Sequence, residues 1–385
     1  MQRRIYRNRK NNILILAVSA AAITVTALFA MLASCEDTGA AVTTETAQTE
    51  TFLQDTTETV TSQTEVQTTE EITTTETVAE PLLLCDADLA EYGEDSPEYE
   101  LYRLFSKEIP KVGENVEVTA TDEEGNITSS TERVWRKGNA ALYYRDITSG
   151  DTVTINGDRV FSVASMIKAA YIYTLLVSAD NGEIDLGEEK VYHSSMFVKG
   201  TGRFKNIESG SVFTIRELIS YTLRYSDNTA YSMLRKRFGT EYFAPVMEAA
   251  GISAANYNQW WSATAVQYGE FFSVLAEYLQ SDSENAKWMK DEMINSGQSV
   301  MLQDALAPDT VAHKYGWDED SYCDGGVVFA DNGTYVVVFM SDLDGGSRLS
   351  ANTKFISSVC AALKLIRAGE VTEEVTEEVT EEVTE

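Results

Sequence analysis

The order of apolar and polar residues along the chain predicts strands at both ends of a central region. Residues 139–157 read as two strands around a Ser-Gly-Asp turn. Strands return at 310–317 and at 325–342, where Asn332-Gly333 is typical of a hairpin. The β-forming segments therefore lie far apart in sequence, and a single sheet would have to be assembled from both ends.

In most of the remaining central region, the apolar residues recur at the spacing of a helix. Amphipathic patterns occupy residues 96–109, 214–225, 240–251, 268–279, 284–294 and 351–367. Thr214 stands where an N-cap is expected, and Gly251 where a helix often ends. The pattern predicts an α+β fold: an antiparallel sheet flanked by helices, with an inserted all-helical lobe. We expect a cleft where the lobes meet.

The N-terminal 35 residues have the organisation of an export signal. A basic segment, residues 1–12, precedes an uncharged apolar run at 13–34. The run closes on Leu-Ala-Ser-Cys35, which resembles the bacterial lipobox, whose cysteine is lipidated. The run is also long enough to span a bilayer, so a transmembrane anchor is the alternative. Either anchor predicts a protein on the outer face of the bacterial cytoplasmic membrane.

Composition separates three further parts of the chain. Residues 36–80 are rich in Thr and Glu and predict a disordered linker. Residues 368–385 repeat Val-Thr-Glu-Glu and predict a disordered acidic tail. Residues 81–367 remain as one folded domain, long enough for a sizeable core.

Charge and residue counts exclude several classes of function. The formal net charge is −31, which argues against a nucleic-acid partner. The two histidines lie far apart in sequence and zinc-site spacings are absent, so we expect no metal and no cofactor. With Cys35 lipidated, three cysteines remain, too few for a disulfide framework. We expect a monomer.

One cation interrupts the apolar stretch of residues 161–176. Lys168 follows Ser165 by three residues, so on a helix both side chains share a face. A lysine in a poorly hydrated pocket becomes a neutral base, which could activate the serine as a nucleophile. The free N–H groups of a helix start would stabilise an oxyanion. The plainer interpretation is a lysine extending from a helix end to water.

Two further motifs follow in the chain. Ser226-Asp227-Asn228 reads plainly as a helix N-cap, or functionally as a proton shuttle beside a substrate-holding amide. Lys314-Tyr315-Gly316 places a lysine on a strand before a glycine, where a backbone can approach a ligand closely. A plain interpretation is an edge-strand lysine in solvent.

The three motifs in this order resemble those of class A β-lactamases and penicillin-binding proteins. The resemblance covers roughly residues 95–367 and implies the β-lactamase/transpeptidase-like fold. It implies Ser165 as the acylated nucleophile, Lys168 as its base and Ser226 as the proton donor to the leaving nitrogen. It implies substrate contacts at Asn228, Lys314, Gly316 and Trp317, with the oxyanion held by the N–H groups of Ser165 and Trp317.

The sequence departs from that family in two places. Between Gly251 and Ala265 there is no Asp or Glu, so the loop glutamate that activates the hydrolytic water is missing. Glu248 and Glu270 flank the gap and read as surface charges, while Asn256, Asn258 and Gln259 are poor bases. Losing a general base typically costs about 10²–10⁴ in rate, so acylation should outpace hydrolysis.

The second departure is Tyr315, where the family usually has threonine or serine, so recognition of a substrate carboxylate is in doubt. Trp260 and Trp261 are expected to fill the space left by the shortened loop, or to stack on a sugar. His313 precedes Lys314 on a strand, so the two side chains should point to opposite faces, and a packed or capping histidine is expected.

These observations predict an exported serine acyl-transfer hydrolase acting on a β-lactam or a peptidoglycan peptide, with slow deacylation. The missing glutamate favours cell-wall peptide or slow lactam hydrolysis over efficient antibiotic resistance. A D-Ala-D-Ala carboxypeptidase-like hydrolase and a catalytically silent cell-wall binding module remain the alternatives.

Overall fold

The computed structural model describes residues 4–5, 81–121, 127–249, 251, 262–297, 301–318, 321–343 and 349–381. The predicted signal segment with Cys35 and the predicted linker lie almost entirely outside these residues. The chain falls into two units, residues 1–79 with 116–132 and residues 80–115 with 133–385. None of the described helices combines the length and the apolar character needed to cross a bilayer.

The first unit contains strand β1 (Arg4–Ile5) and parts of β3 (Lys111–Thr121) and β4 (Ile127–Lys137). β1 pairs antiparallel with β3, which lies between β1 and β4 in the sheet order. These strands were not predicted from the sequence. β4 is exposed along nearly its whole length, so it carries no one-sided apolar pattern that could reveal it.

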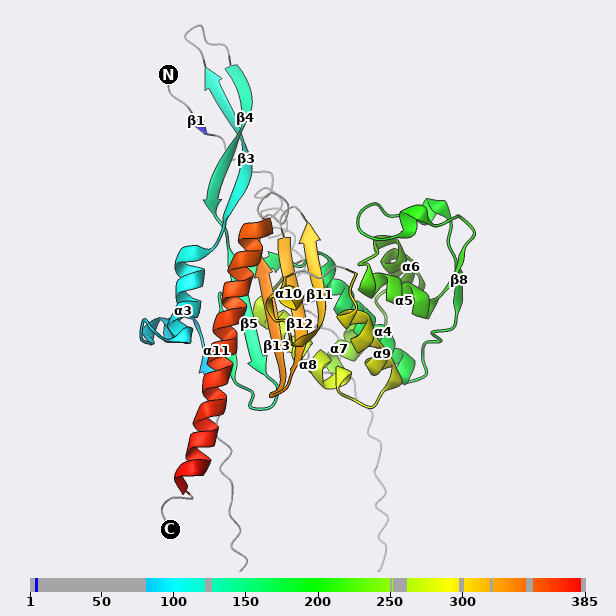
Figure 1. Ribbon diagram of the computed structural model, residues 1–385. Helices are drawn as coiled ribbons and strands as arrows, with labels where there is room; N and C mark the ends of the chain where they lie inside the picture. The colour runs from blue at the N-terminus through cyan, green and yellow to red at the C-terminus, as the bar shows by residue number, and fades with distance from the viewer. Residues whose placement is uncertain are drawn as a thin grey trace, which may run out of the picture. The chain divides into compact units, whose positions relative to one another are not determined.

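The second unit is built on a six-stranded sheet in the order β11-β12-β13-β5-β6-β2 (Figure 1). The strands are β11 (Thr310–Asp318), β12 (Ser321–Ala330), β13 (Gly333–Ser341), β5 (Ala140–Asp146), β6 (Thr152–Ile155) and β2 (Leu83–Leu84). Neighbours are antiparallel, except that β2 pairs parallel with β6. The predicted sheet assembled from both ends of the region, with its hairpin, is confirmed.

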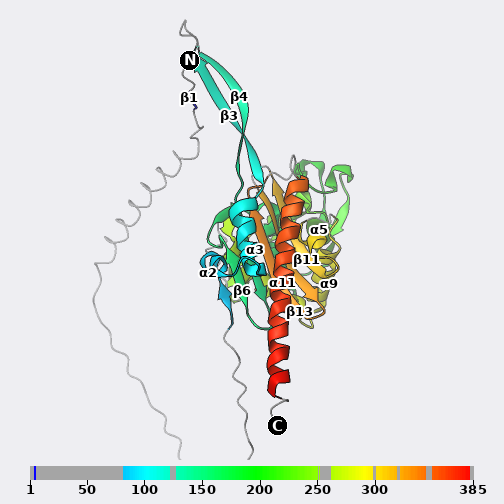
Figure 2. The same ribbon diagram turned by 60° about the vertical axis from the view of Figure 1, so that its left-hand side comes forward.

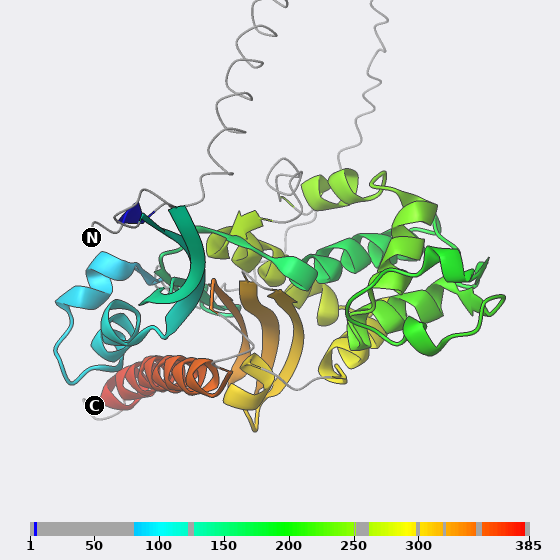
Figure 3. The ribbon, with the colours of Figure 1, turned by 90° about the horizontal axis from the view of Figure 1, so that it is seen from above.

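Helices cover both faces of this sheet (Figures 2 and 3). One core cluster joins β13 to α11 (Leu349–Glu381), α3 (Pro97–Arg103) and the π-helix η1 (Leu104–Glu108). The other joins the sheet to α4 (Ile167–Asp180) and α8 (Ala265–Leu279). This arrangement confirms the predicted α+β fold.

The helical lobe lies in sequence between β7 (Val160–Ser162) and β11. Besides α4 and α8, the longer helices of this stretch are α5 (Ile215–Arg224), α6 (Asn228–Phe238), α7 (Phe243–Ala249) and α9 (Glu284–Ile294). Its shorter elements are β8 (Glu189–Val191), β9 (Val212–Thr214), β10 (Ser262–Thr264) and α10 (Leu302–Ala305), with 3-10 turns η2 (Ala164–Met166), η3 (Ser194–Met196) and η4 (Phe204–Asn206). A further short helix, α2 (Asp86–Glu91), precedes α3. Thr214 caps α5 through the Glu217 N–H, as predicted.

The C-terminal helix differs from the expectation of a disordered tail after residue 367. The backbone of α11 stays helical to Glu381. The repeat contains many glutamates, which favour helix, and neither Gly nor Pro follows Gly369 to stop it.

Candidate active site

Ser165 and Lys168 lie at the junction between a 3-10 turn and a long helix. Ser165 belongs to η2, α4 begins at Ile167, and Lys168 is in its first turn. The Lys168 Nζ donates a hydrogen bond to Ser165 Oγ at 3.0 Å. Ala164 holds a left-handed φ of 43°, a conformation that costs energy in a residue other than glycine. The bend is thus strained immediately before the serine, which remains partly exposed.

The Lys168 amine is surrounded by acceptors but withdrawn from water. It also donates to Ser226 O at 2.6 Å, to Asn228 Oδ1 at 2.7 Å and to Ser226 Oγ at 3.3 Å. Only 2% of the residue is exposed. Burial lowers the pKa of Lys168 to about 7, although the Asp227 carboxylate opposes that shift. A large fraction of the amine is therefore neutral near pH 7, as a general base requires.

Ser226 and Asn228 are positioned by the start of α6. Asp227 is the N-cap, and its Oδ1 accepts from the N–H groups of Thr229 at 2.8 Å and Ala230 at 2.9 Å. The plain capping interpretation of this triplet is therefore confirmed for Asp227. Ser226 itself has a φ of 51°, which turns the chain sharply before the helix.

The loop at residues 200–204 contacts Asp227, and the sequence did not predict it as part of the site. The second oxygen of Asp227 accepts from the N–H groups of Arg203 at 2.5 Å and Phe204 at 3.1 Å. A Cβ on Gly202 would lie 2.0 Å from that oxygen, so only glycine allows the close approach. The closely spaced Gly200 and Gly202 were the available signal, because paired glycines mark a tight backbone approach.

Lys314 reaches Ser226 from the sheet. Its Nζ donates to Ser226 Oγ at 3.1 Å and to Tyr315 O at 2.8 Å. Burial first, and the Lys168 charge second, lower the pKa of Lys314 well below its ordinary value, while the Asp324 charge opposes them. Only 1% of Lys314 is exposed, so in this arrangement it acts on Ser226, and direct contact with a substrate carboxylate requires the amine to become accessible.

Gly316 allows strand β11 to lie directly against η2, the 3-10 turn that contains Ser165 (the serine turn). A Cβ at this position would lie 2.1 Å from Val163 O and 3.1 Å from Ser165 N. The main chain entering Trp317 therefore lies beside the N–H of Ser165, and these two residues are the predicted oxyanion donors. The Trp317 ring packs edge-on against Tyr322 and is 39% exposed.

Tyr315 and His313 are buried in the core rather than exposed at the site. Tyr315 belongs to the core cluster on the α11 side and is 4% exposed. His313 hydrogen-bonds the Asp324 carboxylate, and both side chains are fully buried. His313 is thus a packed histidine, as predicted, and it is not hydrogen-bonded to Ser165.

No described carboxylate takes the place of the missing loop glutamate. Glu248 and Glu270 are both exposed, as predicted. Within the described part of the chain, no carboxylate hydrogen-bonds Ser165 or Lys168. Residues 252–261, with Trp260, Trp261 and the candidate water-holding amides, lie outside the described residues.

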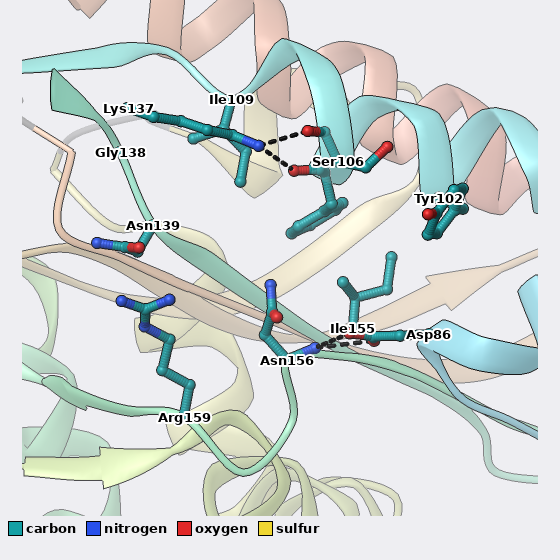
Figure 4. Close-up of a pocket in the computed structure, with 11 residues that line it drawn as sticks. Asp86, Tyr102, Ser106, Ile109, Lys137, Gly138, Asn139, Ile155, Asn156 and Arg159 are labelled. Atoms are coloured by element: carbon teal, nitrogen blue, oxygen red, sulfur yellow. Dashed lines mark hydrogen bonds between the residues drawn. The ribbon is translucent and has the colours of Figure 1, made fainter. Parts of the chain in front are cut away.

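Other features of the described chain do not belong to this cluster. A cavity of about 320 Å³ lies between η1 and the turns at Asn139 and Asn156, and none of the predicted site residues lines it (Figure 4). Cys85, Cys323 and Cys360 are free thiols. Among the described residues, no group of three His, Cys, Asp or Glu side chains could hold a metal ion.

A protein-family comparison connects this geometry with known proteins. The model of the Beta-lactamase enzyme family matches residues 128–365, a range that contains every predicted catalytic residue. A search of curated proteins returns no match.

Solved structures show the same fold at low sequence identity. The β-lactamase of Sphaerobacter thermophilus DSM 20745 is 21% identical, with a TM-score of 0.52 over 59% of this chain and 90% of that one. PBP-A is 18% identical, with a TM-score of 0.56 over 74% of this chain and 97% of that one. A PBP-A variant in an acyl-enzyme complex with penicillin G is 20% identical, with a TM-score of 0.52 over 59% and 89%.

Proposed function

The chain belongs to the Beta-lactamase enzyme family and is a serine hydrolase, and from that premise we propose that Ser165 forms an acyl-enzyme with a β-lactam or a peptidoglycan peptide. The observation that supports this most strongly is the hydrogen-bonded series Ser165, Lys168, Ser226, Lys314, in which each neighbouring pair of polar atoms is 3.0–3.3 Å apart. Nucleophile, base and proton donor need this proximity.

Acylation begins with proton transfer from Ser165 Oγ to the neutral Lys168 amine. The hydroxyl oxygen then bonds to the carbonyl carbon of the amide or lactam, and negative charge develops on the carbonyl oxygen. The N–H groups of Ser165 and Trp317 would stabilise that charge, and each such donor is typically worth about 10²–10³ in rate.

Collapse of the tetrahedral intermediate breaks the carbon–nitrogen bond. Ser226 gives its proton to the leaving nitrogen and takes up the proton that Lys168 received from Ser165, because the Lys168 amine donates to Ser226 Oγ. The Lys314 amine donates to the same oxygen and holds it in place. The site thus returns the serine proton to the product, and one acyl group remains on Ser165. Asn228, which Lys168 holds through its Oδ1, would present its amide to the substrate.

Deacylation is proposed to be slow. It needs a base that activates water on the ester, and no described carboxylate hydrogen-bonds Ser165 or Lys168. The sequence of residues 251–265 contains no Asp or Glu. Removing a general base from such a step typically costs about 10²–10⁴ in rate, so the acyl-enzyme should accumulate.

A D-Ala-D-Ala carboxypeptidase-like activity is the second candidate. The absence of acids from the 251–265 segment supports it, because a penicillin-binding enzyme need not hydrolyse its lactam adduct quickly. A PBP-A variant with the same fold has been solved as an acyl-enzyme complex with penicillin G, which is compatible with acylation of Ser165. A silent cell-wall binding module would not label at all.

A fluorescent penicillin tests the proposal. The full-length protein should acquire one covalent label that survives denaturation, and Ser165→Ala should abolish it. Ser162→Ala is the matched control, since Ser162 lies on the strand before the turn and has no lysine three residues on. Chasing the label with unlabelled penicillin measures its lifetime: minutes or longer indicates slow deacylation, and seconds would contradict it.

We also propose that the protein is exported and acts as a monomer, tethered to the outer face of the cytoplasmic membrane through lipidated Cys35 or through residues 13–34 as an anchor. The basic segment followed by an apolar run supports export. If the protein is a lipoprotein, Cys35→Ala should abolish its metabolic labelling with a fatty acid. If residues 13–34 are the anchor, the same substitution should leave the fraction of protein in the membrane unchanged.

A further inference from the structure

The cavity of about 320 Å³ beside η1 is separate from the Ser165 cluster (Figure 4). Its lining combines buried apolar side chains with charged ones from three segments: α2, the end of β4 and the turn before β7. Small-molecule pockets typically measure roughly 300–1,000 Å³, so this cavity is at the small end of that range. Its size suits a small metabolite or a very short peptide.

One wall of the cavity is apolar. Phe105, Ile109 and Ile155 form this apolar wall, and each is buried. All three belong to the core cluster on the α11 side of the sheet, so close packing holds them in place. An apolar ligand group laid against the apolar wall would remove its remaining surface from water, which is favourable.

Arg159 supplies a cation on one side of the cavity. It lies in the turn before β7, where its N–H donates to Asn156 O at 2.9 Å, and its side chain is exposed. Figure 4 shows its guanidinium on the same side as Asn139, with no hydrogen bond to another lining residue. Within the described part of the chain it forms no ion pair, and its contact with the Phe161 ring is 5.8 Å long. Such a guanidinium can hold a carboxylate through two parallel hydrogen bonds.

The Asp86 carboxylate lies across the cavity from Arg159 (Figure 4). Its two oxygens share the N–H of Asn156, at 2.9 and 3.3 Å. Partial burial raises the pKa of Asp86, and the charge of Asp158 raises it further, although the hydrogen bond from Asn156 opposes both. Asp86 has no cationic partner among the described residues, so a cationic ligand group would stabilise its charged form.

The other amine and amides of the lining already have acceptors. Their side chains donate to protein oxygens: Lys137 to Ser106 O and Phe105 O, Asn139 to Asp342 Oδ2, and Asn156 to Ala140 O. Among the described lining residues, the charged groups left for a ligand are therefore Arg159 and Asp86. A ligand that matches them carries a carboxylate at one end and an ammonium at the other.

The placement of these two charges on opposite sides distinguishes between ligands. A single α-amino acid carries both of its charges on one carbon, so it engages one side at a time. A dipeptide separates its ammonium from its carboxylate by a peptide unit, whose Cα atoms are about 3.8 Å apart. We propose that this cavity binds a dipeptide with free ends, its carboxylate on Arg159, its ammonium on Asp86 and its apolar side chains on the apolar wall. This binding does not depend on acylation of Ser165.

Calorimetric titration of the full-length protein with alanyl-leucine, as the L,L and D,D forms separately, tests the proposal. We expect saturable binding of at least one form below about 10 mM. Acetylating the amine, amidating the carboxylate or shortening the ligand to leucine should each weaken binding at least about tenfold, because each leaves one charged contact unmade. No saturation with either form, or analogues that bind as tightly as the dipeptide, would overturn the proposal.

Two substitutions assign the two ends of the ligand. Arg159→Gln should remove the preference for the dipeptide over its amide. Asp86→Asn, which keeps an acceptor oxygen for Asn156, should remove the preference over the acetylated form. Lys107→Gln removes an exposed cation of η1 that does not line the cavity, and it should leave every affinity unchanged. Preferences retained in both folded variants would refute the assigned ends, and the analogue series decides the matter if a variant does not fold.

Methyl spectra locate the bound dipeptide. In protein with ¹³C-labelled isoleucine methyl groups, each assigned by substitution to valine, the Ile155 signal should shift as alanyl-leucine is added. The signal of Ile167, which follows the serine turn, should not shift, and Ser165→Ala should bind the dipeptide as the parent does. A shift at Ile167 alone, or loss of binding in Ser165→Ala, would place the dipeptide at Ser165 and contradict a second site. Failure of penicillin labelling would count only against the proposed function.

Discussion

The amine of Lys168 bridges the two serines of the site: it donates to Ser165 Oγ at 3.0 Å and to Ser226 Oγ at 3.3 Å. One side chain can therefore receive the proton of the nucleophile and stand next to the group that delivers a proton to the leaving nitrogen. The lone lysine in an otherwise apolar helix start is thus explained by its hydrogen bonds to acceptor oxygens of Ser165, Ser226 and Asn228.

Removing that amine should stop acylation rather than unfold the protein. Lys168→Met keeps the approximate length of the side chain but leaves the acceptors on Ser226 and Asn228 without their donor, so we expect a loss of about 1–3 kcal/mol in the free energy of unfolding. We expect the second-order acylation rate of the folded protein to fall by about 10²–10⁴. Lys287→Met, at an exposed lysine of α9, is the control and should change neither quantity. Acylation within a few-fold of the parent rate would show that Lys168 is not the base.

The acid limb of the pH–rate profile should report Lys168. Burial lowers its pKa to about 7, and only the neutral amine accepts a proton, so the rate should fall about tenfold per pH unit below that value. Stopped-flow labelling from roughly pH 5 to pH 8 measures this limb. A rate independent of pH over this interval would contradict a lysine base.

Strand β11 should tolerate no side chain at Gly316. A Cβ would meet Val163 O at 2.1 Å, so Gly316→Ala must displace either the strand or the serine turn. We expect a loss of about 1–3 kcal/mol in the free energy of unfolding. We also expect at least about a 10²-fold loss of acylation, since a displacement of that size misplaces reacting atoms. Gly93→Ala is the matched control, because nothing lies within 4 Å of its added carbon.

Asp227 should contribute more to stability than an ordinary helix cap. It is buried and accepts from the N–H groups of Arg203, Phe204, Thr229 and Ala230. Asp227→Ala leaves several buried donors unsatisfied, so we expect a loss of about 3 kcal/mol or more in urea unfolding. Ser283→Ala, which removes the cap of α9, should cost only about 1 kcal/mol. Equal losses of stability in the two variants would show that Asp227 contributes no more than an ordinary N-cap.

Much of the fold was predictable because its signals are local. The Asn332-Gly333 hairpin, the Thr214 cap and the helical spacing each depend on residues a few positions apart, and all are present in the structure. The exposed β4 was missed because neither of its faces is consistently apolar, and β3, which pairs with it, was missed as well. The helical course of α11 through the acidic repeat was not predicted, because a repetitive acidic composition is typical of disorder even though glutamate favours helix.

In the site, too, the features that local patterns encode could be predicted, and those that depend on strand pairing could not. The Ser165–Lys168 pair follows from helix geometry, and the opposite orientations of His313 and Lys314 follow from strand alternation. The partnership of His313 with Asp324 depends on the register of β11 with β12, which no local pattern encodes. A lone acid in the otherwise apolar stretch of β12 was the available signal that it has a buried partner.

The most direct test of the account is the intact mass of the protein after brief exposure to penicillin, followed by peptide mapping. We predict a gain of one penicillin mass on the peptide that contains Ser165, persisting for minutes, and no gain in Ser165→Ala. An adduct on another residue, or no adduct in folded protein at saturating penicillin, would contradict the assignment of Ser165 as an acyl-accepting nucleophile.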